Sequence, residues 1–163
     1  MSVDGTDFRF QAPSKGYWIS HKFKKPGVRY ELGVGIQSGD ICWLNGPFPA
    51  GHFPDVVIFR MALKDELENF ERVEADLGYR GDIEKVKVPG PLYVDEKYVQ
   101  AKKEVASWHE TANSRFKSFN CLSQPFRHDL AFHASCFRVV AVLVQLNIED
   151  GETLFDVDYD DNY

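Results

Sequence analysis

The chain of 163 residues has little of several features that would set its class at once. Its three cysteines, Cys42, Cys121 and Cys136, form no CxxC pair, which argues against a disulfide scaffold and favours buried free thiols in a reducing compartment. The first ten residues lack the basic start and apolar run of a signal peptide. The most apolar stretch, 139–148, is too short to span a bilayer. These absences leave a soluble globular protein with no membrane partner.

The chain also lacks an overall excess of basic residues, since 25 acids and 19 bases give a net charge of −6. Residues 149–163 contain seven of the acids and no Lys or Arg, and we expect them to form an acidic C-terminal tail. Without them, 18 acids face 19 bases, so the net charge neither excludes nor indicates a polyanionic partner. A basic cluster with no acid inside it consists of Lys15, Lys22, Lys24, Lys25 and Arg29. This cluster could follow nucleic-acid phosphates, but a solvated hairpin tip explains it equally well.

The first third of the chain is predicted to form strands. Residues 2–11 alternate enough for a strand, which the Asp4-Gly5 pair would break with a turn. Residues 29–37 and 40–48 are two further strand candidates, and Ser38-Gly39 between them is typical of a hairpin.

The rest of the chain alternates between helical and extended patterns. Asp55 is a plausible N-cap for a helix that continues to Phe70. The remaining predicted elements are strands at 72–79 and 85–90 and helices at 95–119 and 130–148, although the β-branched end of the last one could be a strand. The order β, β-hairpin, α, β, β, α, α predicts an α/β protein with a mixed sheet covered by helices.

Three acids stand out by their positions in these elements. Asp4 lies on the first strand, Asp76 at the end of the strand after the first helix, and Glu110 on the polar flank of a helix. Carboxylates from two strands and a helix can converge at one sheet edge and bind Mg²⁺, and two such ions about 4 Å apart can promote phosphodiester hydrolysis. By composition alone, solvated acids at the ends of strands and helices are the simpler explanation, because 25 acids offer many such triples.

Four segments, taken in order, carry a family resemblance: VDGTDFRF, GPFPAGHFPDVVIFR, EADLGYRG and HETANSRFKSF. Together they resemble the nuclease domain of DDE-type transposases, with PIF/Harbinger-like elements and their eukaryotic relatives as the nearest group. The resemblance extends from Val3 to about Gln145. Each motif is short, but their order and spacing are fairly specific. One departure is Ala50, which stands where the family's Pro-Gly-x-x-x-Asp segment has proline.

The resemblance implies an RNase H-like fold, with a mixed five-stranded sheet flanked by helices over residues 1–148. It implies Mg²⁺-dependent (or Mn²⁺-dependent) cutting of DNA and, from the eukaryotic relatives, a nuclear location. Asp4 of the D-G-T segment, Asp76 of the D-x-G-Y segment and the helical Glu110 would be the catalytic metal ligands. The resemblance also implies that Arg115 and Lys117, two basic residues that follow Glu110 on the same helix, bind DNA.

The family usually carries a DNA-recognition region before the first acid, and only three residues precede Asp4 here. We therefore expect an N-terminally truncated domain that lacks the upstream half of a central strand, and a separate DNA-recognition protein is a conceivable partner. The alternative function is a catalytically dead or domesticated remnant that binds DNA or protein. A third hypothesis is a zinc hydrolase that uses His109 and Glu110, but Asn113 stands where HExxH requires its second histidine.

Overall fold

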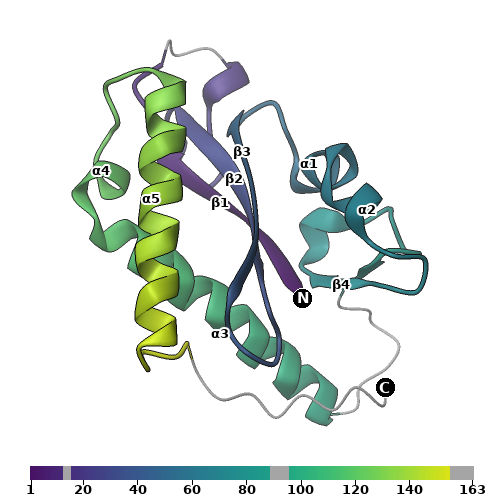
Figure 1. The fold of residues 1–163 in the computed structure, drawn as a ribbon. Coiled ribbons are helices and arrows are strands. Elements are labelled where there is room, and N and C mark those ends of the chain that lie inside the picture. Colours follow the sequence, from purple (N-terminus) through teal and green to yellow (C-terminus); the bar gives the residue numbers. More distant parts are fainter. Residues whose placement is uncertain (13–15, 89–95, 155–163) are drawn as a thin grey trace.

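The computed structural model describes residues 1–12, 16–88 and 96–154 (Figure 1). Five strands form one sheet in the order β3-β2-β1-β4-β5. The strands are β1 (Ser2–Arg9), β2 (Gly27–Val34), β3 (Ile41–Pro49), β4 (Val73–Ala75) and β5 (Val86–Lys87). The helices are η1 (Gly16–Trp18), α1 (Asp55–Met61), α2 (Leu63–Glu66), η2 (Leu77–Tyr79), α3 (Glu96–Ser118), α4 (Asn120–Ser123) and α5 (Leu130–Glu149). The α/β class with a mixed five-stranded sheet flanked by helices is thus confirmed, and it agrees with an RNase H-like fold.

The central strand β1 pairs with a different partner on each side. It is antiparallel to β2 along its whole length and parallel to β4 only at Ser2 and Val3. The predicted turn at Asp4-Gly5 is wrong, because both residues pair with β2 inside one continuous strand of eight residues. Beyond Val3, the edge of β1 that faces β4 has no strand partner within the described residues, and Asp4 is the first residue there.

The two faces of the sheet carry separate hydrophobic cores. On one face, Phe8 and Tyr30 pack against Trp108 of α3 and Phe137 of α5. On the other face, a smaller core gathers Val3, Val73 and Val86 from the strands, Phe59 and Leu63 from α1 and α2, and Tyr79 of η2. This division follows from the two-residue period of a strand, which sends successive side chains of β1 to opposite faces. Each fully buried large side chain stabilises the fold by about 1.5–3 kcal/mol.

Several predicted elements differ from the structure in extent. The helix expected through Phe70 is two short helices, α1 and α2, and Pro54 rather than Asp55 is its N-cap. The strand expected at 72–79 has only three residues and is followed by η2. The β-branched end of the last predicted helix stays helical, since α5 runs to Glu149.

Residues 149–154, the first part of the predicted acidic tail, pack onto the domain. Leu154 is 1% exposed and belongs to the larger core. The guanidinium of Arg115 donates hydrogen bonds to the carbonyl oxygens of Glu152 and Thr153, at 2.5 and 3.0 Å. The rest of the tail, 155–163, lies outside the described residues. The cysteines are free, but Cys42 is exposed and the other two are only partly buried.

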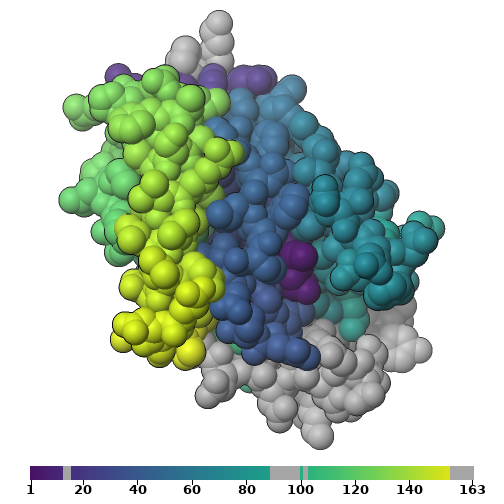
Figure 2. Space-filling model, in the orientation of Figure 1, coloured from purple at the N-terminus to yellow at the C-terminus, as the bar shows by residue number. Residues whose placement is uncertain are grey.

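One side of α5 is exposed along its length, as Figure 2 shows beside β3. Its exposed apolar residues are Phe132, Val139, Val142, Leu143 and Leu146. By length and composition alone this helix could cross a membrane, but the core helix of a soluble protein passes the same test. The opposite side of α5 packs on the sheet through Phe137, Val140 and Val144.

Candidate active site

The three predicted acids line one cavity of about 250 Å³ between β1, β4 and α3. Asp4 follows the last residue of β1 that pairs with β4, and Asp76 directly follows β4. Because the two strands are parallel neighbours, both carboxylates emerge at the same level of the sheet. Glu110 reaches the cavity from α3, which covers this end of β1. The fold therefore brings together three acids that are far apart in the sequence.

The three carboxylates differ in their surroundings. Burial raises the pKa of Asp4, the nearby Lys22 ammonium lowers it, and the Asp76 carboxylate raises it again. Asp76 is exposed, and its Oδ1 accepts a hydrogen bond of 2.7 Å from the Gly78 N–H, which fixes its direction. Glu110 is also exposed, so its side chain can change rotamer at low cost.

The donor chemistry of this site suits a hard divalent cation, because all three candidate ligands are carboxylates. Asp4 and Asp76 are close enough for each charge to act on the other. Across residues 1–12, 16–88 and 96–154, no three His, Cys, Asp or Glu side chains are already arranged to hold one ion.

A fourth carboxylate, Asp55 of α1, lies near enough to this pair to feel both charges, although its predicted role was only that of a helix cap. Its side chain is 16% exposed and does not cap α1. A Cβ on Gly5 would lie 2.0 Å from Asp55 Oδ1. A Cβ on Gly78 would lie 3.0 Å from Asp55 Oδ2 and 2.9 Å from Asp76 Oδ1. The glycines of the D-G-T and D-x-G-Y segments thus leave room for the Asp55 carboxylate beside them.

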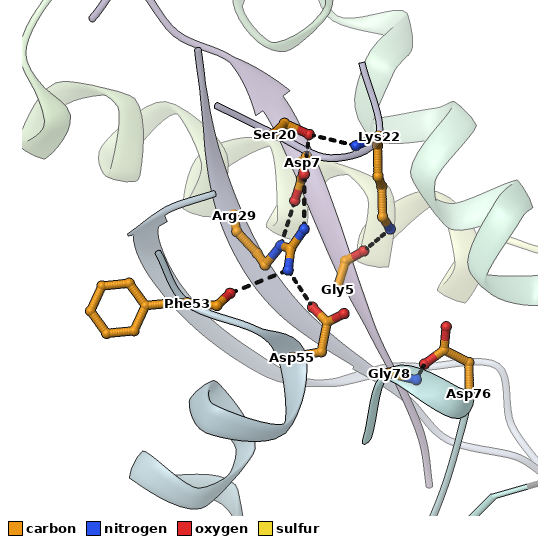
Figure 3. A network of polar contacts seen from close by, with 9 residues as sticks. All are labelled: Gly5, Asp7, Ser20, Lys22, Arg29, Phe53, Asp55, Asp76 and Gly78. Atoms are coloured by element: carbon orange, nitrogen blue, oxygen red, sulfur yellow. Dashed lines mark hydrogen bonds and ion pairs between the residues drawn. The ribbon is translucent and has the colours of Figure 1, made fainter. Parts of the chain in front are cut away.

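A buried arginine holds Asp55 in this place (Figure 3). Arg29 Nη1 lies 3.1 Å from Asp55 Oδ1 and also donates to the Phe53 carbonyl oxygen at 3.2 Å. The same guanidinium donates to both carboxylate oxygens of Asp7, from Nε to Oδ1 at 2.7 Å and from Nη2 to Oδ2 at 3.0 Å. Ser20 Oγ donates to Asp7 Oδ2 at 2.5 Å. Arg29 and Asp7 face each other directly in the β1–β2 register, which makes this bidentate pair possible.

Comparison with known proteins identifies the family of this fold and site. Residues 3–145 match the family model described as DDE superfamily endonuclease. The chain belongs to this family. No curated protein and no solved structure matches the chain. The predicted membership of a DDE-type nuclease family is confirmed, while the PIF/Harbinger subgroup stays a prediction.

In this DDE endonuclease domain, Arg29 does not fit the predicted role in DNA binding. Its side chain is 6% exposed and its charge is balanced by Asp7 and Asp55. Arg115 is also engaged, because it binds the carbonyl oxygens of Glu152 and Thr153. Both arginines therefore serve the fold, and we leave them out of the DNA-contacting set proposed below.

The predicted DNA-binding lysines have different settings in the domain. Lys22, Lys24 and Lys25 are exposed residues of the loop before β2, while Lys15 lies outside the described residues. Lys22 turns inward, and its Nζ donates to the Gly5 carbonyl oxygen. Lys117 of α3 places its Nζ 5.8 Å from the ring centroid of Phe8. Burial lowers the pKa of Lys117, as does the nearby Lys22 ammonium, so these two lysines share one neighbourhood.

His109 lines the same cavity as a buried neutral imidazole. It is 5% exposed, and its Nε2 lies 3.0 Å from Ser2 Oγ. Burial lowers its pKa to about 4, so at pH 7 the ring carries no charge. His109 packs against the start of β1, and no three-residue zinc cluster forms around it in the part of the chain that the structure describes. The zinc-hydrolase hypothesis gains no support from this geometry.

Proposed function

We propose that this domain is a transposase-derived endonuclease that cuts DNA phosphodiester bonds with divalent metal ions held by Asp4, Asp76 and Glu110. The observation that carries the proposal is the single cavity lined by these acids in a DDE-family fold. Carboxylate oxygens suit Mg²⁺ or Mn²⁺. When bound, two such ions about 4 Å apart supply an activated water and stabilise the leaving oxygen of the phosphodiester.

Each acid contributes to this site in its own way. Asp4 sits on the central strand, so its carboxylate is held rigidly in a partly desolvated position where a cation would offset its burial. Asp76 accepts the Gly78 N–H with Oδ1, and its Oδ2 would bind the cation. Glu110 supplies a mobile carboxylate from α3 that can close on the pair once a cation and DNA are present. Lys22, Lys24, Lys25 and Lys117 are the proposed DNA-contacting residues.

The test is nicking of supercoiled DNA by the purified chain with Mg²⁺, Mn²⁺ or EDTA. We expect metal-dependent nicking that falls by at least about a hundredfold in Asp4→Asn, Asp76→Asn and Glu110→Gln, because each change removes a ligand charge. Asp65→Asn, which alters an exposed acid on α2 outside the cavity, is the matched control and should keep full activity. Circular dichroism must show that all variants are folded. Undiminished cutting by a pure Asp76→Asn preparation refutes the metal-ligand assignment.

The rival function is binding without catalysis. It is favoured by the present spacing of the acids, since no three ligand-type side chains among the described residues are already clustered for one ion. This function predicts a folded wild-type protein that binds DNA but gives no metal-dependent nicking, with Asp76→Asn indistinguishable from it. The nicking assay therefore decides between the two functions.

We also propose a nuclear location and DNA as the partner, in line with the family. A separate DNA-recognition protein would then choose the DNA ends. Imaging of a fluorescently tagged chain and recovery of DNA-bound partners test this part. A purely cytoplasmic signal would contradict the location.

A further inference from the structure

Lys22 is held in the site by a loop that is fixed to the buried polar network. Ser20, whose hydroxyl donates to Asp7, is 0% exposed, and its Oγ accepts the backbone N–H of Lys22 at 3.1 Å. Backbone hydrogen bonds from Ser20 N to Lys25 O and from Lys24 N to Ser20 O close the loop at 3.0 and 2.9 Å. The position of the Lys22 stem is therefore set by the same buried residues that hold Asp55.

The ammonium of Lys22 contacts the strand that carries Asp4, at the residue next to it. Its Nζ donates to the carbonyl oxygen of Gly5, the neighbour of Asp4 (Figure 3). Among the charged groups that act on the pKa of Asp4, Lys22 has the largest effect, and it also lowers the pKa of Asp55. Lys22, Lys24 and Lys25 are all exposed residues of this loop, but neither Lys24 nor Lys25 is among the groups that perturb these two acids.

We propose that Lys22 has two roles in this site: its ammonium partly neutralises the carboxylates in the free protein, and it moves to a phosphate oxygen of the DNA strand when substrate and divalent cations bind. The proposal rests on the proposed function, because it concerns the same carboxylates. Lysine suits this exchange because its ammonium is a point charge on a flexible four-carbon stem with three donors. Releasing the Gly5 carbonyl costs one hydrogen bond, while a phosphate oxygen offers a charge-assisted one.

The two roles predict effects of opposite sign. Without Lys22, a divalent cation meets less repulsion near Asp4, so metal affinity rises. Without Lys22, the DNA strand also loses a phosphate contact at the cutting position, so DNA affinity and turnover fall. A lysine that only pins the loop to Gly5 would not tighten metal binding when it is removed.

The test compares Lys22→Gln and Lys22→Arg with the matched controls Lys24→Gln and Lys25→Gln, which remove the same charge from the same loop. Mn²⁺ affinity is measured without DNA by paramagnetic resonance. DNA affinity is measured with Ca²⁺ over a range of salt concentrations. We expect Lys22→Gln to bind Mn²⁺ about fivefold more tightly and DNA about fivefold more weakly. Lys22→Arg should restore most of both properties, and the controls should leave Mn²⁺ affinity unchanged.

Mn²⁺ affinity that is unchanged or lower in Lys22→Gln, or raised equally by Lys24→Gln, overturns the proposal. Lys22→Met, which keeps the apolar stem, replaces Lys22→Gln if the latter lowers the melting temperature. Wild-type Mn²⁺ binding that is absent, or unaffected by Asp76→Asn, overturns the proposed function instead. In that case, DNA affinity alone decides on Lys22: a loss no larger than that in Lys24→Gln and Lys25→Gln overturns any role for it beyond that of the other lysines of the loop.

Discussion

Replacing Arg29 with methionine should be among the most damaging single changes in the described fold. Arg29 joins two acids from different elements, Asp7 on β1 and Asp55 on α1, and its side chain is 6% exposed. Methionine fills a similar length of the site without charge. It would leave Asp7, which is 3% exposed, with only the Ser20 hydroxyl as its hydrogen-bond donor among the contacts described above.

The size of the effect follows from the cost of an unpaired buried charge. Removing one partner of a buried ion pair typically lowers the free energy of unfolding by about 3–5 kcal/mol. A domain of this size is stable by about 5–15 kcal/mol in total, so Arg29→Met would lose a large share of its stability. The melting temperature should fall by about 6–20 °C. Calorimetry and urea unfolding at pH 7 measure both quantities.

The matched control is Arg60→Met, which removes a partly exposed arginine from an ion pair that has a second cation. Arg60 lies 2.9 Å from Asp82 with its side chain 44% exposed, and Lys64 pairs with the same carboxylate at 3.0 Å. Because solvent reaches the Arg60 guanidinium and Lys64 still pairs with the buried Asp82 carboxylate, the loss should stay below about 1 kcal/mol. Equal losses in Arg29→Met and Arg60→Met would refute the view that the Asp7–Arg29–Asp55 network holds the site together.

Three further outcomes follow from the structure. Gly5→Ala should lower the free energy of unfolding by about 1–3 kcal/mol and weaken Mn²⁺ binding, because the new Cβ would lie 2.0 Å from Asp55 Oδ1. Gly16→Ala is the control, since a Cβ there would meet nothing within 4 Å, and it should change neither quantity in the same titrations. Burial raises the pKa of Glu31 from 4.5 to about 7, so the folded state favours its protonated form and the wild type loses stability as pH rises from 4.5 through 7. Glu31→Gln should remove this pH dependence, so that its free energy of unfolding gains about 3 kcal/mol relative to that of the wild type between pH 4.5 and 8. If urea unfolding gives the two proteins the same change of free energy with pH, the prediction is wrong. Arg115→Gln should release the backbone at Glu152 and Thr153, seen as faster hydrogen exchange at 152–154, with less than about 1 kcal/mol lost in global stability; unchanged exchange would show that Leu154 alone holds this segment.

The sequence by itself determined the order of the elements and the placement of three acids. Local patterns decide both: the hairpin at Ser38-Gly39 and the long helices α3 and α5 follow from turn residues and periodicity that act over a few positions. The D-G-T and D-x-G-Y segments marked Asp4 and Asp76 in the same local way. The order of the elements and the position of each acid in its element can be predicted in this way because residues that are close in the chain are also close in the fold.

Only the tertiary structure decided what surrounds these acids. Gly5 looked like a turn residue, yet it pairs with β2 inside β1, and Asp55, fifty positions later, occupies the space that a side chain there would need. Arg29 and Lys22 belonged to one basic cluster, yet the strand register pairs Arg29 with Asp7 and the loop directs Lys22 to Gly5. Such contacts depend on which strands become neighbours, and no local pattern encodes that choice, because it is made by the burial of two whole cores.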